Sequence, residues 1–265
     1  MRLVSIASGS SGNCIYVGND NTHLLVDVGI SAKKIEAGLK EIDLCGKDLD
    51  GILITHEHSD HIQGIGVMAR KYGIPIYATR GTIQEILQKK TLGDIDVSLF
   101  ESIQADSPFM IKDMEINSMR ISHDARDPVA YRFRSGDKCA AIATDMGMYD
   151  DYTVDCLKGM DVLLLEANHD INMLQVGPYP YPLKQRILGS HGHLSNEAGG
   201  RLLSKVLHDD MKAIVLGHLS KENNLPELAY ETVKLEVTMG DNPYDGNDFP
   251  ILVAKRDGTF PKLEF

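Results

Sequence analysis

The sequence predicts an α/β or α+β fold built as one domain of 265 residues. Short apolar runs typical of strands recur along the whole chain, and amphipathic segments typical of helices separate many of them. Hydrophobic residues make up 43% of the chain, which is enough to bury a large core. No low-complexity tract and no linker interrupts this pattern, so we expect residues 1–265 to form a single domain.

Strand patterns dominate the first part of the chain. Residues 19–21 (Asn-Asp-Asn) and 135–137 (Ser-Gly-Asp) have the composition of hairpin turns, and Ser31 is a candidate N-cap for the first helix. We expect strands at residues 2–6, 13–18, 22–27, 52–54, 74–77, 97–100, 108–111, 114–121, 129–134 and 138–143, and helices at residues 30–42, 63–72 and 82–88.

The second part of the chain alternates strands with longer helices. Ser195 or Asn196 is a candidate N-cap at the start of one of these helices. We expect strands at residues 160–165, 213–216 and 251–254, and helices at residues 196–207 and 226–237.

The composition favours a cytoplasmic protein with no membrane segment. No apolar run reaches the ~18 residues of a bilayer-spanning helix, and the apolar start at residues 1–6 is too short for a signal peptide. The four cysteines form no CxxC pair, so we expect free thiols in a reducing compartment. Cys14 lies near a glycine-rich loop, where a ligand role is conceivable but buried packing is favoured.

The chain is acidic, with 27 basic and 38 acidic residues and a net charge of −11. This balance argues against a broad basic face for nucleic acid, although it leaves room for a local one. No feature of the sequence specifies an oligomeric state.

The most informative segment is residues 55–61 (Thr-His-Glu-His-Ser-Asp-His), which holds three imidazoles and two carboxylates. It follows the predicted strand at residues 52–54 and precedes a helix that Gly64 and Gly66 open. Strand-to-helix turns of this kind carry the chemistry in many α/β folds. Imidazole and carboxylate are ligands that Zn²⁺, Mn²⁺ and Fe share, so the segment predicts a metal site.

The spacing within this segment favours two metal ions rather than one. In an extended or turn conformation, His56 and His58 share one side of the chain. Asp60 and His61 then reach a second point a short distance away. Two ions need further ligands, and we expect these at other strand ends.

Three other residues of ligand type directly follow apolar runs. They are His123, Asp145 and His218, and each comes a residue or two after a predicted strand. Taken singly, each is also compatible with a cap or turn residue. Together with residues 55–61 they supply enough ligands for two coordination spheres.

Residues 55–61 resemble the HxHxDH signature of the metallo-β-lactamase superfamily. The resemblance implies a four-layer α-β-β-α sandwich with a dinuclear metal site. Asp27, within residues 24–29, matches the first motif of the superfamily, and the resemblance implies that it orients ligands rather than binding metal. Carried over to this sequence, one metal would be bound by His56, His58, His123 and Asp145, and the other by Asp60, His61, His218 and the bridging Asp145.

Two further segments bear on the substrate. The small-residue loop at residues 7–13 offers backbone N–H groups and hydroxyls to an anion, with Ser10, Ser11 and Asn13 as candidate contacts, although a flexible turn has the same composition. Residues 190–198 open a helix and resemble the corresponding element of ribonuclease Z and its relatives. In those enzymes the histidine matching His193 assists the leaving group or holds the scissile phosphate; a polar helix turn is the alternative.

Four segments resemble the YycJ/WalJ group of bacterial metallo-hydrolases. They are residues 8–14, 123–128, 165–170 and 218–224. The group is associated with DNA exonuclease activity from 5′ ends and is encoded beside a cell-wall regulatory two-component system. The resemblance therefore implies that the substrate is a nucleic acid, with DNA favoured.

The sequence predicts metal-assisted phosphodiester hydrolysis with two divalent ions, Zn or Mn, although Fe suits the same ligands. Asp60 would orient the nucleophile or accept its proton, and His193 would stabilise the developing charge or protonate the departing oxygen. His169 would either contact substrate or support a ligand. A basic rim of Arg126, Lys184 and Arg186 would contact a polymer, although any one of these is also compatible with ordinary surface.

Two alternative functions remain compatible with the sequence. One is a small-molecule phosphodiesterase or esterase of the same fold. The other is a non-catalytic metal-binding regulator linked to a two-component system. An open groove would favour a polymer substrate, and a closed cup would favour a small molecule.

Overall fold

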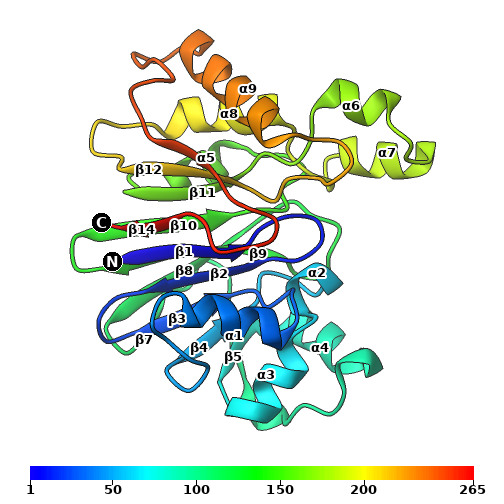
Figure 1. The fold of residues 1–265 in the computed structure, drawn as a ribbon, viewed down its shortest axis with the longest axis vertical. Helices are drawn as coiled ribbons and strands as arrows, with labels where there is room; N and C mark the ends of the chain where they lie inside the picture. Colours follow the sequence, from blue (N-terminus) through cyan, green and yellow to red (C-terminus); the bar gives the residue numbers. More distant parts are fainter.

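Two seven-stranded β-sheets pack face to face, and helices cover the outer face of each sheet (Figure 1). The computed structural model describes residues 1–265. The four layers confirm the α-β-β-α sandwich that the resemblance implies.

The first sheet joins an antiparallel edge to a parallel region. Strands β14, β1, β2 and β3 pair in antiparallel fashion, and β3 to β6 run parallel. Its helices form the lower layer of Figure 1. The elements are β1 (Arg2–Ala7), β2 (Cys14–Gly18), β3 (His23–Val26), α1 (Ala32–Lys40), β4 (Gly51–Leu53), α2 (Ser59–Ile62), α3 (Ile65–Tyr72), β5 (Ile76–Thr79), α4 (Arg80–Gln88), β6 (Phe100–Ile103) and β14 (Lys262–Glu264), with the short 3-10 helices η1 (Lys90–Leu92) and η2 (Val97–Leu99).

The second sheet has the same plan. Strands β7 to β10 are antiparallel, and β10 to β13 are parallel. No helix in either layer has the length and apolar character that crossing a bilayer requires. The elements are β7 (Phe109–Ile111), β8 (Met114–Arg120), β9 (Val129–Ser135), β10 (Lys138–Ala143), α5 (Asp151–Leu157), β11 (Val162–Glu166), α6 (Ile171–Val176), α7 (Tyr181–Leu188), α8 (Asn196–Val206), β12 (Ala213–Gly217), α9 (Pro226–Met239) and β13 (Ile251–Val253).

The apolar core has three parts because successive side chains of a strand point to opposite faces of its sheet. In β3, Leu24 and Val26 join the cluster between the two sheets, whereas Leu25 joins the cluster under the helices of the first sheet. A third cluster lies between the second sheet and the helices α5, α8 and α9. The central strands are therefore buried on both faces, which explains their continuous apolar sequence.

Most of the predicted strands and helices are confirmed within a few residues. The strand predicted at residues 97–100 is wrong over its first three residues, because the Asp96 side chain accepts the Ser98 N–H and starts η2. The sequence patterns do not predict α2, α5, α6, α7 or β14. These elements are three to eight residues long and show too little periodicity. β14 also depends on pairing between the two ends of the chain, with Arg2 opposite Glu264.

Tyr131 of β9, in the second sheet, contacts Ile54 beside the first sheet, directly before residues 55–61. Its buried hydroxyl donates to the carbonyl oxygen of Ile54, at 2.9 Å. Tyr131→Phe should leave this buried carbonyl without its partner and lower the free energy of unfolding by about 1–3 kcal/mol, measured by urea denaturation. Tyr230→Phe is the matched control, since the Tyr230 hydroxyl makes no hydrogen bond, and equal stability of the two variants would contradict the prediction.

Candidate metal centre

Six residues of ligand type lie at the same edge of the sandwich. Each one ends a strand or follows its carboxyl end, and in sheets of this kind such ends form the binding crevice. Asp27 follows β3, His56 follows β4, His123 follows β8, Asp145 follows β10, Glu166 ends β11 and His218 follows β12.

Backbone hydrogen bonds fix the residue 55–61 segment against two neighbouring loops. The Val28 N–H donates to the His61 carbonyl and the Asn13 N–H donates to the Asp60 carbonyl, both at 2.8 Å. The Gly29 N–H in turn donates to the Asn13 carbonyl at 2.7 Å. A Cβ atom at residue 29 would overlap the Asp60 carbonyl, so glycine is required for this close approach.

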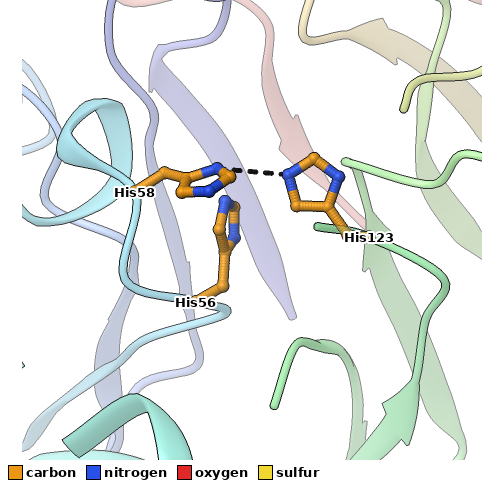
Figure 2. Close-up of side chains that lie close together, drawn as sticks. All are labelled: His56, His58 and His123. Atoms are coloured by element: carbon orange, nitrogen blue, oxygen red, sulfur yellow. Dashed lines mark hydrogen bonds between the residues drawn. The ribbon is translucent and has the colours of Figure 1, made fainter. Parts of the chain in front are cut away.

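Three histidines form the first ligand group (Figure 2). His58 Nδ1 and His123 Nε2 lie 3.2 Å apart, and the His56 ring lies edge-on to both other rings. Because His123 Nδ1 lies 3.1 Å from the Gly192 carbonyl, Nδ1 carries the proton and Nε2 presents a lone pair to the group. His56 Nδ1 likewise bonds the Thr55 hydroxyl at 3.0 Å, which leaves Nε2 to face the same point.

Asp60, His61 and His218 form the second group. One carboxylate oxygen of Asp60 lies 3.5 Å from Nε2 of each histidine. Asp27 accepts a hydrogen bond from His61 Nδ1 at 2.7 Å and others from the N–H and hydroxyl of Thr55. Asp27 therefore fixes the His61 ring with Nε2 toward the group, which is the orienting position that the resemblance implies.

Asp145 lies between the two groups. Its Oδ1 is 3.8 Å from His123 Nε2, and its Oδ2 is 3.4 Å from His61 Nε2. Its side chain is almost completely buried. The carboxylate thus has one oxygen toward each group, as a bridging ligand requires.

Glu166 is an important site residue whose role the sequence analysis missed. It is 0% exposed, and its Oε1 accepts hydrogen bonds from Nδ1 of His193 (2.9 Å) and of His218 (2.8 Å). Its Oε2 accepts the backbone N–H groups of Met146 and Leu194. The available signal was an acidic residue at the end of the apolar run of β11, the same context that identified the other ligand-type residues.

Opposite charges balance one another among the side chains of the site. Burial alone would lower the pKa of His218, but the surrounding carboxylates, Asp145 foremost, raise it to about 10. Burial raises the pKa of Asp60, but the neighbouring imidazoles of His61 and His218 together outweigh this effect and lower it. Metal ligation needs neutral imidazole, so a metal held by His218 would compete with a proton there, and metal affinity would rise with pH.

The donor set fits divalent metal ions. His56 Nε2, Asp145 Oδ2 and His218 Nε2 are buried and have no hydrogen-bond partner, a costly state that a bound cation would relieve. Asp27, Asp145 and His218 also hold positive backbone φ angles of 59°, 62° and 56°. Such strained backbone concentrates at functional sites. Imidazole nitrogen and carboxylate oxygen suit Zn, Mn and Fe alike.

A cavity of about 270 Å³ opens over the ligand groups, with α7 on one side. Ser10 and His193 line this cavity, and Ser11 lies in an adjoining groove. Asn13 is buried, and its amide nitrogen lies 3.2 Å from His61 Nε2 while its oxygen accepts the Gly9 N–H. Asn13 therefore contacts a candidate ligand but does not line the cavity.

The three basic residues of the predicted rim have separate surroundings. Arg186 lines the cavity but is ion-paired with Asp124. Lys184 donates to the Gln175 carbonyl at 2.7 Å, and exposed Arg126 packs beside Gly81 at the start of α4. Arg186 alone of the three lines the cavity over the ligands.

His169 is 1% exposed and does not line the cavity. Its Nδ1 lies 3.3 Å from Oδ1 of Asn168, whose side-chain amide donates to the His218 carbonyl at 2.8 Å. Of the two roles left open by the sequence, this position favours support of a ligand over contact with substrate.

The sandwich and the ligand groups at its edge define the metallo-β-lactamase class of protein. The chain matches the family described as Beta-lactamase superfamily domain over residues 23–218. It is 44% identical over 259 residues to exodeoxyribonuclease WalJ of Streptococcus pneumoniae, covering 98% of this chain and 96% of that protein. It is 41% identical over 228 residues to exodeoxyribonuclease YycJ of Bacillus anthracis, covering 86% of each chain.

The fold of zinc-bound PqqB from Methylobacterium extorquens is also similar, with a TM-score of 0.74, 16% identity and full coverage of both chains. The chain therefore belongs to the metallo-β-lactamase superfamily and, within it, to the WalJ/YycJ family.

Asp27→Asn should weaken metal binding without unfolding the protein. Asparagine has one acceptor oxygen instead of two and no charge, so it cannot keep the hydrogen bonds from both His61 and Thr55, and we expect metal affinity to fall about 10–100-fold. Competition with a chromophoric chelator measures the affinity. Asp137→Asn, at an exposed hairpin position, is the control, and the same affinity in both variants would rule out an orienting role for Asp27.

Proposed function

We propose that this protein is a metal-dependent exodeoxyribonuclease that binds two divalent ions and digests DNA from 5′ ends. The observation that carries the proposal is the pair of ligand groups on either side of the buried carboxylate of Asp145. Membership of a family whose relatives are named exodeoxyribonucleases supports DNA as the substrate. The fold, the family and the ligand groups make the chain a metal-dependent hydrolase.

Each ligand group would hold one ion, with Asp145 shared between them. Bound divalent ions lower the pKa of water and stabilise negative charge on a phosphate oxygen. Asp60 directs one carboxylate oxygen into the second group and is partly exposed to the cavity, so it can orient an attacking water or accept its proton. Zn and Mn both suit this set, and Fe has the same preferences.

His193 is placed to act on the leaving oxygen. Its Nδ1 is held by Glu166, so the proton on Nδ1 is fixed and Nε2 is free for another partner. The ring lines the cavity between His123 and His218 and is 20% exposed. A proton on Nε2 would pass to the departing oxygen, and the buried Glu166 carboxylate would stabilise the cationic ring that precedes this transfer.

A small-molecule phosphodiesterase is the second candidate. The cavity directly over the ligands holds about 270 Å³, and the Arg186 charge at its edge is neutralised by Asp124. Both features suit a compact diester. A non-catalytic regulator would need only the two ligand groups. It gives no role to His193 held by Glu166, a pair that resembles an acid and its orienting carboxylate.

The central test is hydrolysis of 5′- and 3′-labelled DNA and RNA, with Zn²⁺, Mn²⁺ and Fe²⁺ restored one at a time to stripped protein. We expect nucleotides to be released from DNA 5′ ends by protein that contains close to two ions per chain. Asp145→Ala should lose both metal and activity because the shared ligand is removed. Activity on bis(p-nitrophenyl) phosphate without activity on any nucleic-acid end would instead support the small-molecule enzyme.

His193→Ala should keep its metal content and its fold while losing about 10²-fold in the rate of DNA hydrolysis, the usual contribution of a general acid. Steady-state kinetics and metal analysis of the same preparation measure the two effects. His191→Ala is the control, since that side chain is exposed and bonds only its neighbour Ser190. Loss of metal in the His193 variant would show that this residue is a ligand.

A further inference from the structure

A second groove, of about 600 Å³, adjoins the cavity over the ligand groups and shares Ser10 and Asp60 with it. Its wall is rich in hydrogen-bond donors, and Asp60 is its one acidic residue. The remaining lining residues are Ser11, Ser59, Ile62, Gln63, Lys89, Lys90, Thr91 and Leu92. Hydroxyl, amide and ammonium groups in this proportion suit phosphate oxygens, which only accept hydrogen bonds.

The two lysines of this groove carry charge that the protein does not neutralise. Neither Lys89 nor Lys90 has a carboxylate within 4.0 Å, although the chain has 38 acidic and only 27 basic residues. Arg256 adds a third cation without a carboxylate partner on the Ser10 side, with its guanidinium 3.5 Å from the Ser10 hydroxyl. Unneutralised cations beside a phosphodiesterase site attract the charged backbone of the substrate.

The turn that bears the lysines is tied to the core and to α3. Lys89 follows α4 as its C-cap, and Lys90 begins η1, whose Leu92 side chain is buried in the core under the helices of the first sheet. Arg70 Nη1 donates to the backbone carbonyls of Leu92 and Asp94, both at 2.9 Å. The backbone that carries the two lysines is therefore anchored at Leu92 and through Arg70.

We propose that this groove binds the phosphate backbone of the nucleic-acid strand next to the phosphate that is cleaved. The inference rests on the proposed nuclease function. It identifies the surface by which the protein would prefer a polymer to a small diester. Ser10 and Asp60 belong to both cavities, so a strand whose scissile phosphate lies at the ligand groups can continue into the groove. Its neighbouring phosphates then meet Lys89 and Lys90, whereas Lys184 and Arg186 are engaged by the protein itself.

The test compares wild type with Lys89→Ala/Lys90→Ala, both metal-loaded, on single-stranded DNA 20-mers and on bis(p-nitrophenyl) phosphate. We expect KM for the 20-mer to rise about tenfold more than KM for the small diester, which has no neighbouring phosphate. The slope of log KM against log salt concentration should fall by about 1.4, since each single-strand phosphate contact contributes about 0.7. Melting curves check that the variant is folded.

Lys47→Ala/Lys212→Ala is the matched control. It removes the same charge from two exposed lysines without carboxylate partners, which precede β4 and β12 and so lie at the opposite edge of the sheets from the ligands. It should leave KM for the 20-mer unchanged.

Three outcomes would overturn the assignment or its basis. Equal KM values for wild type and the Lys89/Lys90 variant on the 20-mer would exclude the groove. A KM effect confined to 5′-phosphorylated 20-mers would show that the lysines bind a terminal phosphate rather than the backbone. Wild-type protein that hydrolyses the small diester but no 20-mer would refute the nuclease function itself, before the groove is tested.

Discussion

The structure depends on burying several ionisable side chains together at one edge of a sandwich. Asp27, Asp145 and Glu166 are nearly inaccessible to water, and an isolated carboxylate in such a position would be strongly unfavourable. The structure accommodates them because each carboxylate lies next to at least one imidazole. Bound metal ions would take the place of the protons on these imidazoles. The arrangement that allows carboxylates to be buried beside the apolar layers therefore also provides the ligands of the metal centre.

Much of the candidate site was predictable because its signals are local. His123, Asp145 and His218 each follow an apolar run, and that local context identified them as candidate ligands. Glu166 has the same local context, but its role lies in contacts with His193 and His218, which are 27 and 52 residues away. A sequence pattern cannot reveal contacts of that separation.

The fold was predictable to a similar degree. Long strands and helices with clear periodicity were found, whereas α6 and α7 were not, although α7 forms one side of the cavity. The predicted basic rim shows the same difficulty. Charge is visible in the sequence, but the pairing of Arg186 with Asp124 and the hydrogen bond from Lys184 to the Gln175 carbonyl are not. The expectation that residues 1–265 form one domain stays a prediction.

The two ends of the chain lie side by side, at the left of Figure 1. The Met1 ammonium donates to the Phe265 carbonyl at 2.7 Å, and β14 pairs antiparallel with β1 from Arg2 opposite Glu264. A mechanical force applied between the ends would therefore break the hydrogen bonds between β1 and β14 one at a time, beginning at Arg2 and Glu264. The two strands would separate before the force reached the ligand residues, which lie at the other end of β1.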